Sequence, residues 1–194
     1  MNLEAICVYC ASSHRAPRAY LDAAADLGRA LARSGLTVLC GGGAGGLMGA
    51  LTDAALAAGG RVIGVRPAFM SELESPHPRA TEMIFTETMH QRKQLLYDRA
   101  DAFVALPGAI GTLDEIIETI TWKRLGLHNK PICLLNVQGF FDPLLAQFER
   151  LVRQDLVAEP FLSLYAHSPD VPGVMAHLQN HTPVTAGPIM WEDR

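Results

Sequence analysis

Short, continuous apolar runs alternate with longer amphipathic stretches along the whole chain. The runs have the length of strands and lack polar alternation, which is typical of parallel strands buried on both faces of a sheet. The expected strands are residues 4–10, 36–40, 61–65, 82–86, 101–106 and 131–136. The expected helices are 17–34, 46–59, 89–100, 112–125, 141–154 and, with a weaker pattern, 171–180. Repeated β–α units of this length predict an α/β fold with a doubly wound parallel sheet.

The bulk properties favour one domain and exclude several partner classes. A chain of 194 residues suits a single domain, predicted over 1–182, with an extended tail over 183–194 that contains Pro183 and Pro188. The net charge of −4 and the scattered basic residues argue against a nucleic-acid partner. No apolar run is long enough to span a membrane, and the N-terminus lacks the pattern of a signal peptide.

Cys7 and Cys10 form a C-x-x-C pattern, which is found in zinc and redox sites. No second cysteine pair or paired histidines accompany it, and it lies inside an apolar run rather than at a helix start. We therefore expect reduced, buried cysteines in a cytoplasmic protein and no metal site.

Two loops that follow expected strands are candidates for ligand contact. Gly41, Gly43 and Gly46 satisfy G-x-G-x-x-G, whose glycines let the backbone approach a phosphate before a helix N-terminus. The next strand ends without the acidic residue of dinucleotide sites, so a mononucleotide or sugar phosphate fits better than NAD. Tight strand–helix packing is the alternative reason for these glycines. Ser12 and Ser13 offer hydroxyls to a ligand or serve only as turn residues.

The segment Pro107–Glu115 joins an apolar strand to an amphipathic helix through two glycines. Free N–H groups at a helix start bind anions, and the Thr112 hydroxyl adds a donor. Glu115 is either an ionised carboxylate facing the ligand or the partner of Thr112 in a capping box. Glu118, one turn further, either shares the pocket or faces solvent. In this helix Ile116, Ile117 and Ile120 are the expected buried face.

Arg92 and Lys93 lie in the first turn of the helix expected over 89–100, where cations are unfavourable to the helix dipole. This placement favours a role for Arg92 in recognising phosphate or developing charge. An exposed basic helix start is the alternative.

Taken together, these motifs resemble the LOG (lonely guy) family, the cytokinin riboside 5′-monophosphate phosphoribohydrolases that once carried a lysine decarboxylase label. The family signature PGGxGTxxE is matched by Pro107–Glu115. Further matching segments are residues 10–13, 41–49, 89–93, 121–126, 130–131 and 135–137, and the resemblance covers roughly residues 5–155.

The resemblance implies a Rossmann-like sheet, a homodimer, and hydrolysis of a nucleoside 5′-monophosphate (a cytokinin riboside 5′-monophosphate, AMP or both) to free base and ribose 5-phosphate, with no cofactor. It assigns Arg92 and Glu115 as the catalytic pair. The implied phosphate- and substrate-binding residues are Ser12, Ser13, Gly43, Gly46, Met48, Met89, Lys93, Gly108, Ala109, Ile110, Gly111, Thr112 and Glu118.

Two residues depart from the signature: Ala109 replaces its second glycine, and Ile110 stands where an aromatic residue is common. An alanine can present its N–H to phosphate here only if its φ is negative. A non-catalytic nucleotide or cofactor carrier therefore remains an alternative. The decarboxylase reaction would need a Schiff-base lysine, and the only lysines are Lys93, Lys123 and Lys130.

Overall fold

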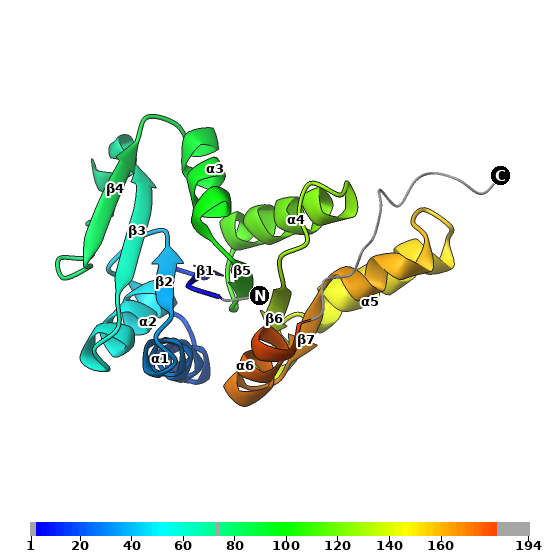
Figure 1. Ribbon diagram of the computed structural model, residues 1–194, viewed down its shortest axis with the longest axis horizontal. Helices are drawn as coiled ribbons and strands as arrows, with labels where there is room; N and C mark the ends of the chain where they lie inside the picture. The colour runs from blue at the N-terminus through cyan, green and yellow to red at the C-terminus, as the bar shows by residue number, and fades with distance from the viewer. Residues whose placement is uncertain (1–2, 73, 182–194) are drawn as a thin grey trace.

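A seven-stranded sheet forms the centre of the computed structural model, which describes residues 3–72 and 74–181 (Figure 1). The strands are β1 (Ala5–Tyr9), β2 (Thr37–Cys40), β3 (Val62–Pro67), β4 (Glu82–Thr86), β5 (Ala102–Ala105), β6 (Ile132–Leu135) and β7 (Ala166–Ser168). Their order across the sheet is β4-β3-β2-β1-β5-β6-β7, and every neighbouring pair is parallel. The predicted single-domain α/β architecture with a parallel sheet is confirmed.

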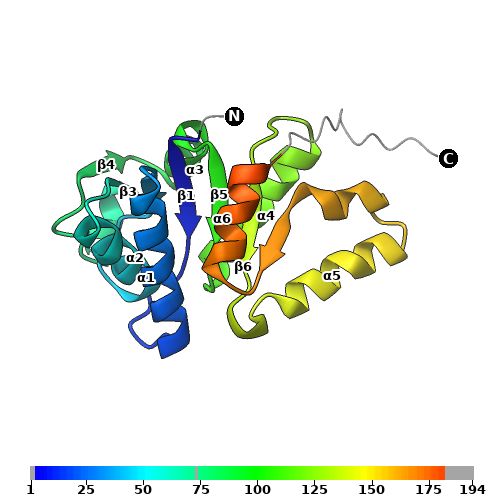
Figure 2. The same cartoon turned by 60° about the horizontal axis from the view of Figure 1, so that its bottom comes forward.

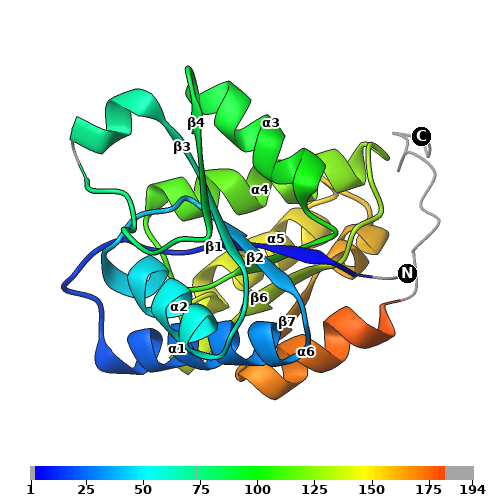
Figure 3. The same ribbon diagram turned by 60° about the vertical axis from the view of Figure 1, so that its left-hand side comes forward.

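Helices cover both faces of the sheet, as the sequence predicts. They are α1 (Arg18–Arg33), α2 (Gly46–Ala57), α3 (Met89–Arg99), α4 (Ile110–Arg124), α5 (Asp142–Arg153) and α6 (Val171–Asn180). Figure 3 shows α1, α2 and α6 below the strands and α3 and α4 above them. In Figure 2, α1 and α6 lie on the near side with β1 visible between them. Within the described residues, no helix combines the length and the apolar character needed to cross a membrane.

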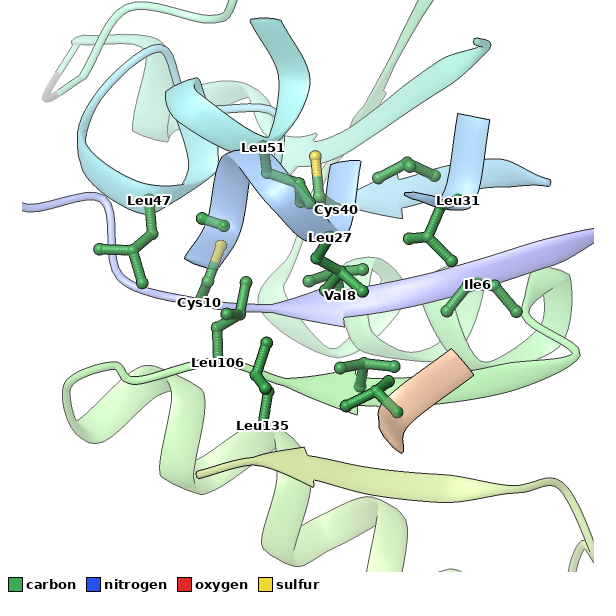
Figure 4. Packing of buried hydrophobic residues seen from close by; sticks show 14 of the residues in the cluster. Ile6, Val8, Cys10, Leu27, Leu31, Cys40, Leu47, Leu51, Leu106 and Leu135 are labelled. Atoms are coloured by element: carbon green, nitrogen blue, oxygen red, sulfur yellow. The ribbon is translucent and has the colours of Figure 1, made fainter. Parts of the chain in front are cut away.

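The alternation of side chains along β1 explains why its sequence is apolar at every position. Ile6 and Val8 pack on one face, in a cluster with residues of α1, α2 and α6, part of which Figure 4 shows. Cys7 and Tyr9 point to the other face, into a cluster with residues of α3, α4 and α5. Because both faces are covered, each of these side chains is at most 5% exposed.

The C-x-x-C cysteines point to opposite faces of the sheet. Cys7 belongs to one apolar cluster and Cys10 to the other, so they do not form a joint ligand pair. All four cysteines are free and buried, as expected, and burial raises the pKa of the Cys7 and Cys10 thiols well above the ordinary value. Among the described residues, no cluster of His, Cys, Asp and Glu is arranged to hold a metal ion.

The structure differs from the sequence-based prediction in four respects. The seventh strand, β7, was not predicted, because Ala166-His167-Ser168 contains no apolar run. Helix α4 begins at Ile110, two residues before the predicted start. Ile117, predicted to be buried, is 41% exposed. Short 3₁₀ helices, η1 (Ala68–Glu72), η2 (Val137–Gly139) and η3 (Glu159–Leu164), were also not predicted. The tail predicted over 183–194 lies outside the described residues.

The sheet order reverses between β1 and β5, which are neighbours. From β1 the chain continues to α1 on one face, and from β5 it continues to α4 on the other. The two connecting loops therefore diverge at the carboxyl ends of these strands. In doubly wound sheets this is the place where ligands bind.

Candidate active site

A cavity of about 350 Å³ lies at the carboxyl ends of β1 and β5, and this volume is in the usual range for small-molecule sites. Its wall comes from the loops after several strands and from the first turns of α3 and α4. The lining residues are Cys10, Ala11, Ser12, Ser13, Gly41, Met48, Met70, Glu74, Met89, Arg92, Ala109, Gly111, Thr112 and Glu115. Both predicted catalytic residues are among them.

One wall of the cavity is the N-terminal end of α4. Ala109 is the N-cap residue, and among the described residues no side chain caps the helix there. The first-turn N–H groups and the positive end of the helix dipole are therefore free to meet an anion. A Cβ on Gly111 would have no atom within 4 Å, whereas a Cβ on Gly108 would lie 2.1 Å from Thr112 Oγ1. Gly108 thus makes room for the Thr112 side chain, and Gly111 lies beside open space.

Ala109 fits its position without strain. Its φ is −86° and its ψ is −163°, an extended conformation that any L-residue adopts. The departure from the family glycine therefore does not disturb the backbone of the helix start.

Arg92 and Glu115 form a buried ion pair inside the cavity. Arg92 NH1 lies 2.6 Å from Glu115 Oε1, and each residue is 8% exposed. Arg92 Nε also donates to the Val65 carbonyl at 3.1 Å, and a Cβ on Gly41 would lie 2.9 Å from Arg92 NH2. The backbone of β3 and the glycine after β2 thus fix the guanidinium opposite the carboxylate.

This geometry decides two alternatives that the sequence leaves open. The capping box is not formed, because α4 starts before Thr112 and the Glu115 carboxylate binds Arg92. Arg92 is not an exposed helix residue, since it is buried against the sheet.

Two opposing effects act on the pKa of Glu115, burial and its partner Arg92. Burial raises the pKa of the Glu115 carboxyl above its ordinary value, because the interior disfavours a charge. The Arg92 guanidinium opposes this shift through its charge and its hydrogen bond. The ionised carboxylate in this cavity therefore depends on Arg92.

Two predicted glycines lie just outside the cavity wall, where they allow close contact between loops. A Cβ on Gly46, whose φ is +55°, would lie 2.5 Å from the Ser13 carbonyl oxygen. A Cβ on Gly43 would lie 2.4 Å from Glu74 Oε1. Gly46 thus brings the start of α2 against the Ser12–Ser13 loop, and Gly43 leaves room for a carboxylate.

Lys93, Glu118 and Ile110 do not line the cavity. Lys93 Nζ binds Glu118 Oε1 at 3.0 Å and Asp114 Oδ2 at 3.2 Å, so these charges form a network beside the site. Ile110 is 81% exposed at the start of α4.

The cavity also contains two residues that the sequence did not indicate, Met70 and Glu74. Both lie in the segment between β3 and β4, Met70 in the short helix η1 and Glu74 after it. The one available indication was an acidic residue in a loop that follows a strand at the edge where ligands bind.

Known proteins resemble this chain in sequence over most of its length. A family model described as "Possible lysine decarboxylase" matches residues 48–178. A probable cytokinin riboside 5′-monophosphate phosphoribohydrolase, LOGL9 of Oryza sativa subsp. japonica, is 40% identical over 92% of this chain and 79% of its own length. The Arabidopsis thaliana enzyme LOG2 is 38% identical over 92% of this chain and 84% of its own length. The chain belongs to the LOG family. The predicted resemblance is thereby confirmed.

Solved structures share the fold of this LOG-family chain. The molybdenum cofactor binding protein of Rippkaea orientalis superposes with a TM-score of 0.71 at 22% identity, covering 92% of this chain and 97% of that one. The molybdenum cofactor carrier protein of Chlamydomonas reinhardtii gives a TM-score of 0.71 at 24% identity, with the same coverage. At these identities the likeness concerns the fold alone.

Proposed function

We propose that this protein hydrolyses the N-glycosidic bond of a nucleoside 5′-monophosphate, a cytokinin riboside 5′-monophosphate, AMP or both. The observation that carries this proposal is the buried Arg92–Glu115 pair beside the uncapped N-terminus of α4. It puts a carboxylate next to an anion site, as cleavage of a phosphorylated riboside requires. Relatives at 36–40% identity carry the name of this activity.

The 5′-phosphate in this proposal binds the first-turn N–H groups of α4, with the hydroxyls of Ser12, Ser13 and Thr112 as further donors. All three hydroxyl residues line the cavity, and the phosphate would also meet the positive end of the helix dipole. In this proposal the sugar meets Glu115 and the base meets the methionines of the cavity lining.

Bond cleavage gives the ribose ring an oxocarbenium-like positive charge, while the bonding electrons leave with the base nitrogen. The ionised Glu115 stabilises that charge and accepts a proton from the water whose oxygen bonds to C1′. The departing base takes up a proton, so that the products are free base and ribose 5-phosphate. Arg92 stays charged and positions Glu115 and the substrate, since a guanidinium does not act as an acid in proteins.

The geometry of the site does not favour the alternatives. The carrier hypothesis depended on a disturbed phosphate loop at Ala109, and this residue has an ordinary negative φ. The decarboxylase reaction would need a lysine in the cavity. Lys93 is engaged by two carboxylates, and Lys123 and Lys130 donate to backbone carbonyls away from the cavity wall.

We further propose that the protein is a cytoplasmic homodimer. Ile110, Ile117 and Leu125 are 81%, 41% and 56% exposed along α4, and an exposed apolar stripe of this kind suits a protein partner. The four free thiols suit a reducing compartment.

The test is release of free base and ribose 5-phosphate from AMP and from isopentenyl-adenosine monophosphate, followed by chromatography. Glu115→Gln keeps the shape of the side chain but loses its charge, so turnover is expected to fall by about 10²–10⁴-fold. Asp114→Asn is the matched control, because it removes an exposed carboxylate from the same turn of α4 outside the cavity. This control should stay within about threefold of the wild type.

The proposal fails if the wild-type protein releases no base from either nucleotide. It also fails if Glu115→Gln is as active as the Asp114→Asn control.

A further inference from the structure

Glu74 is a second carboxylate in the cavity, and the proposed chemistry does not use it. Its Oε1 atom is buried and has no hydrogen-bond partner among the described residues. A buried carboxylate oxygen without a donor is unfavourable, and native structures rarely keep one without a reason. The Glu74 carboxylate, which lines the cavity, therefore has unused capacity to accept a hydrogen bond.

The position of Glu74 is fixed by a buried arginine under the cavity wall. Arg66, on β3, is 1% exposed, and its NH2 donates to the carbonyls of Met70 at 2.8 Å and Glu74 at 2.6 Å. The same segment forms an isolated bridge between Gly43 and Pro76, which ties it to the glycine loop after β2. The carboxylate lies against Gly43, where any side chain would collide with it.

Arg66 also acts on the electrostatics of this wall. Its Nε and NH1 atoms are buried without a partner among the described residues. Burial lowers the pKa of the Arg66 guanidinium, the Glu74 carboxylate opposes that shift, and the Arg92 guanidinium adds to it. The Arg66 charge thus interacts with the Glu74 carboxylate.

The chemistry of the wall indicates which part of the substrate meets Glu74. A carboxylate repels the phosphate, which has its own donors at the start of α4. Met48, Met70 and Met89 line the cavity with Glu74, and methionines form adaptable, polarizable contacts with aromatic rings. Glu74 and these methionines therefore suit contact with the base.

We propose that Glu74, held in place by Arg66, accepts a hydrogen bond from the exocyclic amine of the base and so selects nucleotides that carry an N–H there. A carboxylate only accepts, so a base without this donor leaves the Glu74 carboxylate without a partner in the cavity. A singly N6-substituted adenine keeps one N–H and remains a substrate. The inference rests on the proposed hydrolase function and makes Glu74 a specificity-determining residue and Arg66 a positioning residue.

The test compares AMP with purine riboside 5′-monophosphate, which lacks the amine. The ratio of the two kcat/KM values is measured for the wild type and for Glu74→Ala. Because charged hydrogen bonds are among the stronger ones, the preference for AMP is expected to fall about ten- to a hundredfold in the variant. The ratio does not depend on the fraction of folded enzyme, so partial loss of folding leaves it interpretable.

A second pair of substrates tests whether Glu74 contacts the sugar rather than the base. The ratio of AMP to 2′-deoxy-AMP should be the same in the wild type and in Glu74→Ala. If Glu74→Ala lowers the ratio of AMP to 2′-deoxy-AMP and leaves the ratio of AMP to purine riboside 5′-monophosphate unchanged, Glu74 binds the ribose and the inference is wrong. If the wild type hydrolyses AMP and Glu74→Ala leaves the first ratio unchanged, the inference fails alone. If the wild type hydrolyses no nucleotide, the proposed function itself has failed.

Arg66→Met tests the positioning role, and the exposed Arg61, which pairs with Glu82 just before β3, provides the control Arg61→Met. Arg66→Met is expected to lower the preference for AMP over purine riboside 5′-monophosphate in part, whereas the control keeps it. A purely structural Arg66 would lower both kcat/KM values equally, and this outcome would overturn its assigned role.

Discussion

Replacing Lys123 with methionine is expected to stabilise the protein against unfolding at neutral pH. Lys123 lies in the last turn of α4, the helix that carries Glu115, and is only 3% exposed. Its Nζ donates one hydrogen bond, to the Lys130 carbonyl at 2.9 Å. Burial lowers the pKa of the Lys123 ammonium from 10.5 to about 8, because the charged form loses its hydration.

The magnitude follows from these two pKa values. Below pH 8 the ammonium is charged in the folded and the unfolded protein, and folding carries the full cost of burying it. Between pH 8 and 10.5 the unfolded chain keeps the proton that the folded protein releases, so stability rises with pH. At about 1.4 kcal/mol per pH unit, the cost below pH 8 is ~3 kcal/mol. Methionine removes this cost and loses a hydrogen bond worth about 1 kcal/mol, so a net gain of about 1–2 kcal/mol is expected.

The assay is denaturant unfolding of the wild type and Lys123→Met, followed by circular dichroism at pH 7 and at pH 10. The gain at pH 7 corresponds to a rise in Tm of roughly 3–6 °C and should shrink markedly at pH 10. At each pH the free energy of unfolding of the wild type is subtracted from that of the variant, which removes the contributions of other groups that titrate in this range. The exposed Arg153 serves as a control, since Arg153→Met should change stability by under about 0.5 kcal/mol at both pH values. A variant no more stable than the wild type at pH 7, or a difference that is the same at both pH values, would refute the reasoning.

Three further substitutions test the site and the proposed assembly. Arg92→Gln should move the acidic limb of the kcat/KM–pH profile to higher pH, because Arg92 lowers the pKa of Glu115 and so opposes the effect of burial. If the remaining activity of the variant shows the same acidic limb as the wild type, this prediction is wrong. Ala109→Gly should keep AMP turnover within about twofold of the wild type and lower the free energy of unfolding by about 0.4–1 kcal/mol. Alanine already adopts the native φ of −86° without strain, so glycine only increases the conformational entropy of the unfolded chain. A large gain in turnover would show that the alanine weakens the site. Ile117→Glu should halve the mass measured by light scattering, because a charge on the exposed α4 stripe disrupts an apolar interface. A wild-type mass of 21.0 kDa would contradict the dimer itself.

The sequence predicted the fold best where an apolar run along the chain corresponds to a strand that is buried on both faces. The strands near the centre of the sheet are apolar at every position because both faces are covered, so β1 and β5 could be predicted from composition alone. The edge strand β7 has only three residues, one of them an exposed histidine, and no local pattern marks it. Ile117 was assigned to the wrong side of α4, because three isoleucines in five residues do not define a narrow apolar stripe.

The sequence predicted which motifs form the candidate site, but not which side chains in it contact each other. Spacing along the chain could not separate a capping box from an ion pair for Glu115, because the partner comes from another helix. Glu74 and Arg66 were missed for the same reason. Their roles depend on a loop that crosses to the glycine segment after β2, and this crossing leaves no periodic pattern in the sequence.

The pairing of charges around the cavity explains why phosphate recognition in this protein must be local. A buried guanidinium lies near each carboxylate: Arg92 forms an ion pair with Glu115, and Arg66 donates to the Glu74 carbonyl and interacts with the Glu74 carboxylate through its charge. These opposite charges offset each other, and the whole chain carries a net charge of −4, so no broad positive field draws an anion to the site. In the proposed complex the attraction comes from uncapped N–H groups and hydroxyls at the start of α4, which act only at hydrogen-bond distance. A backbone of ordinary geometry is sufficient for such donors, and for that reason an alanine can stand at position 109, where the family signature has glycine.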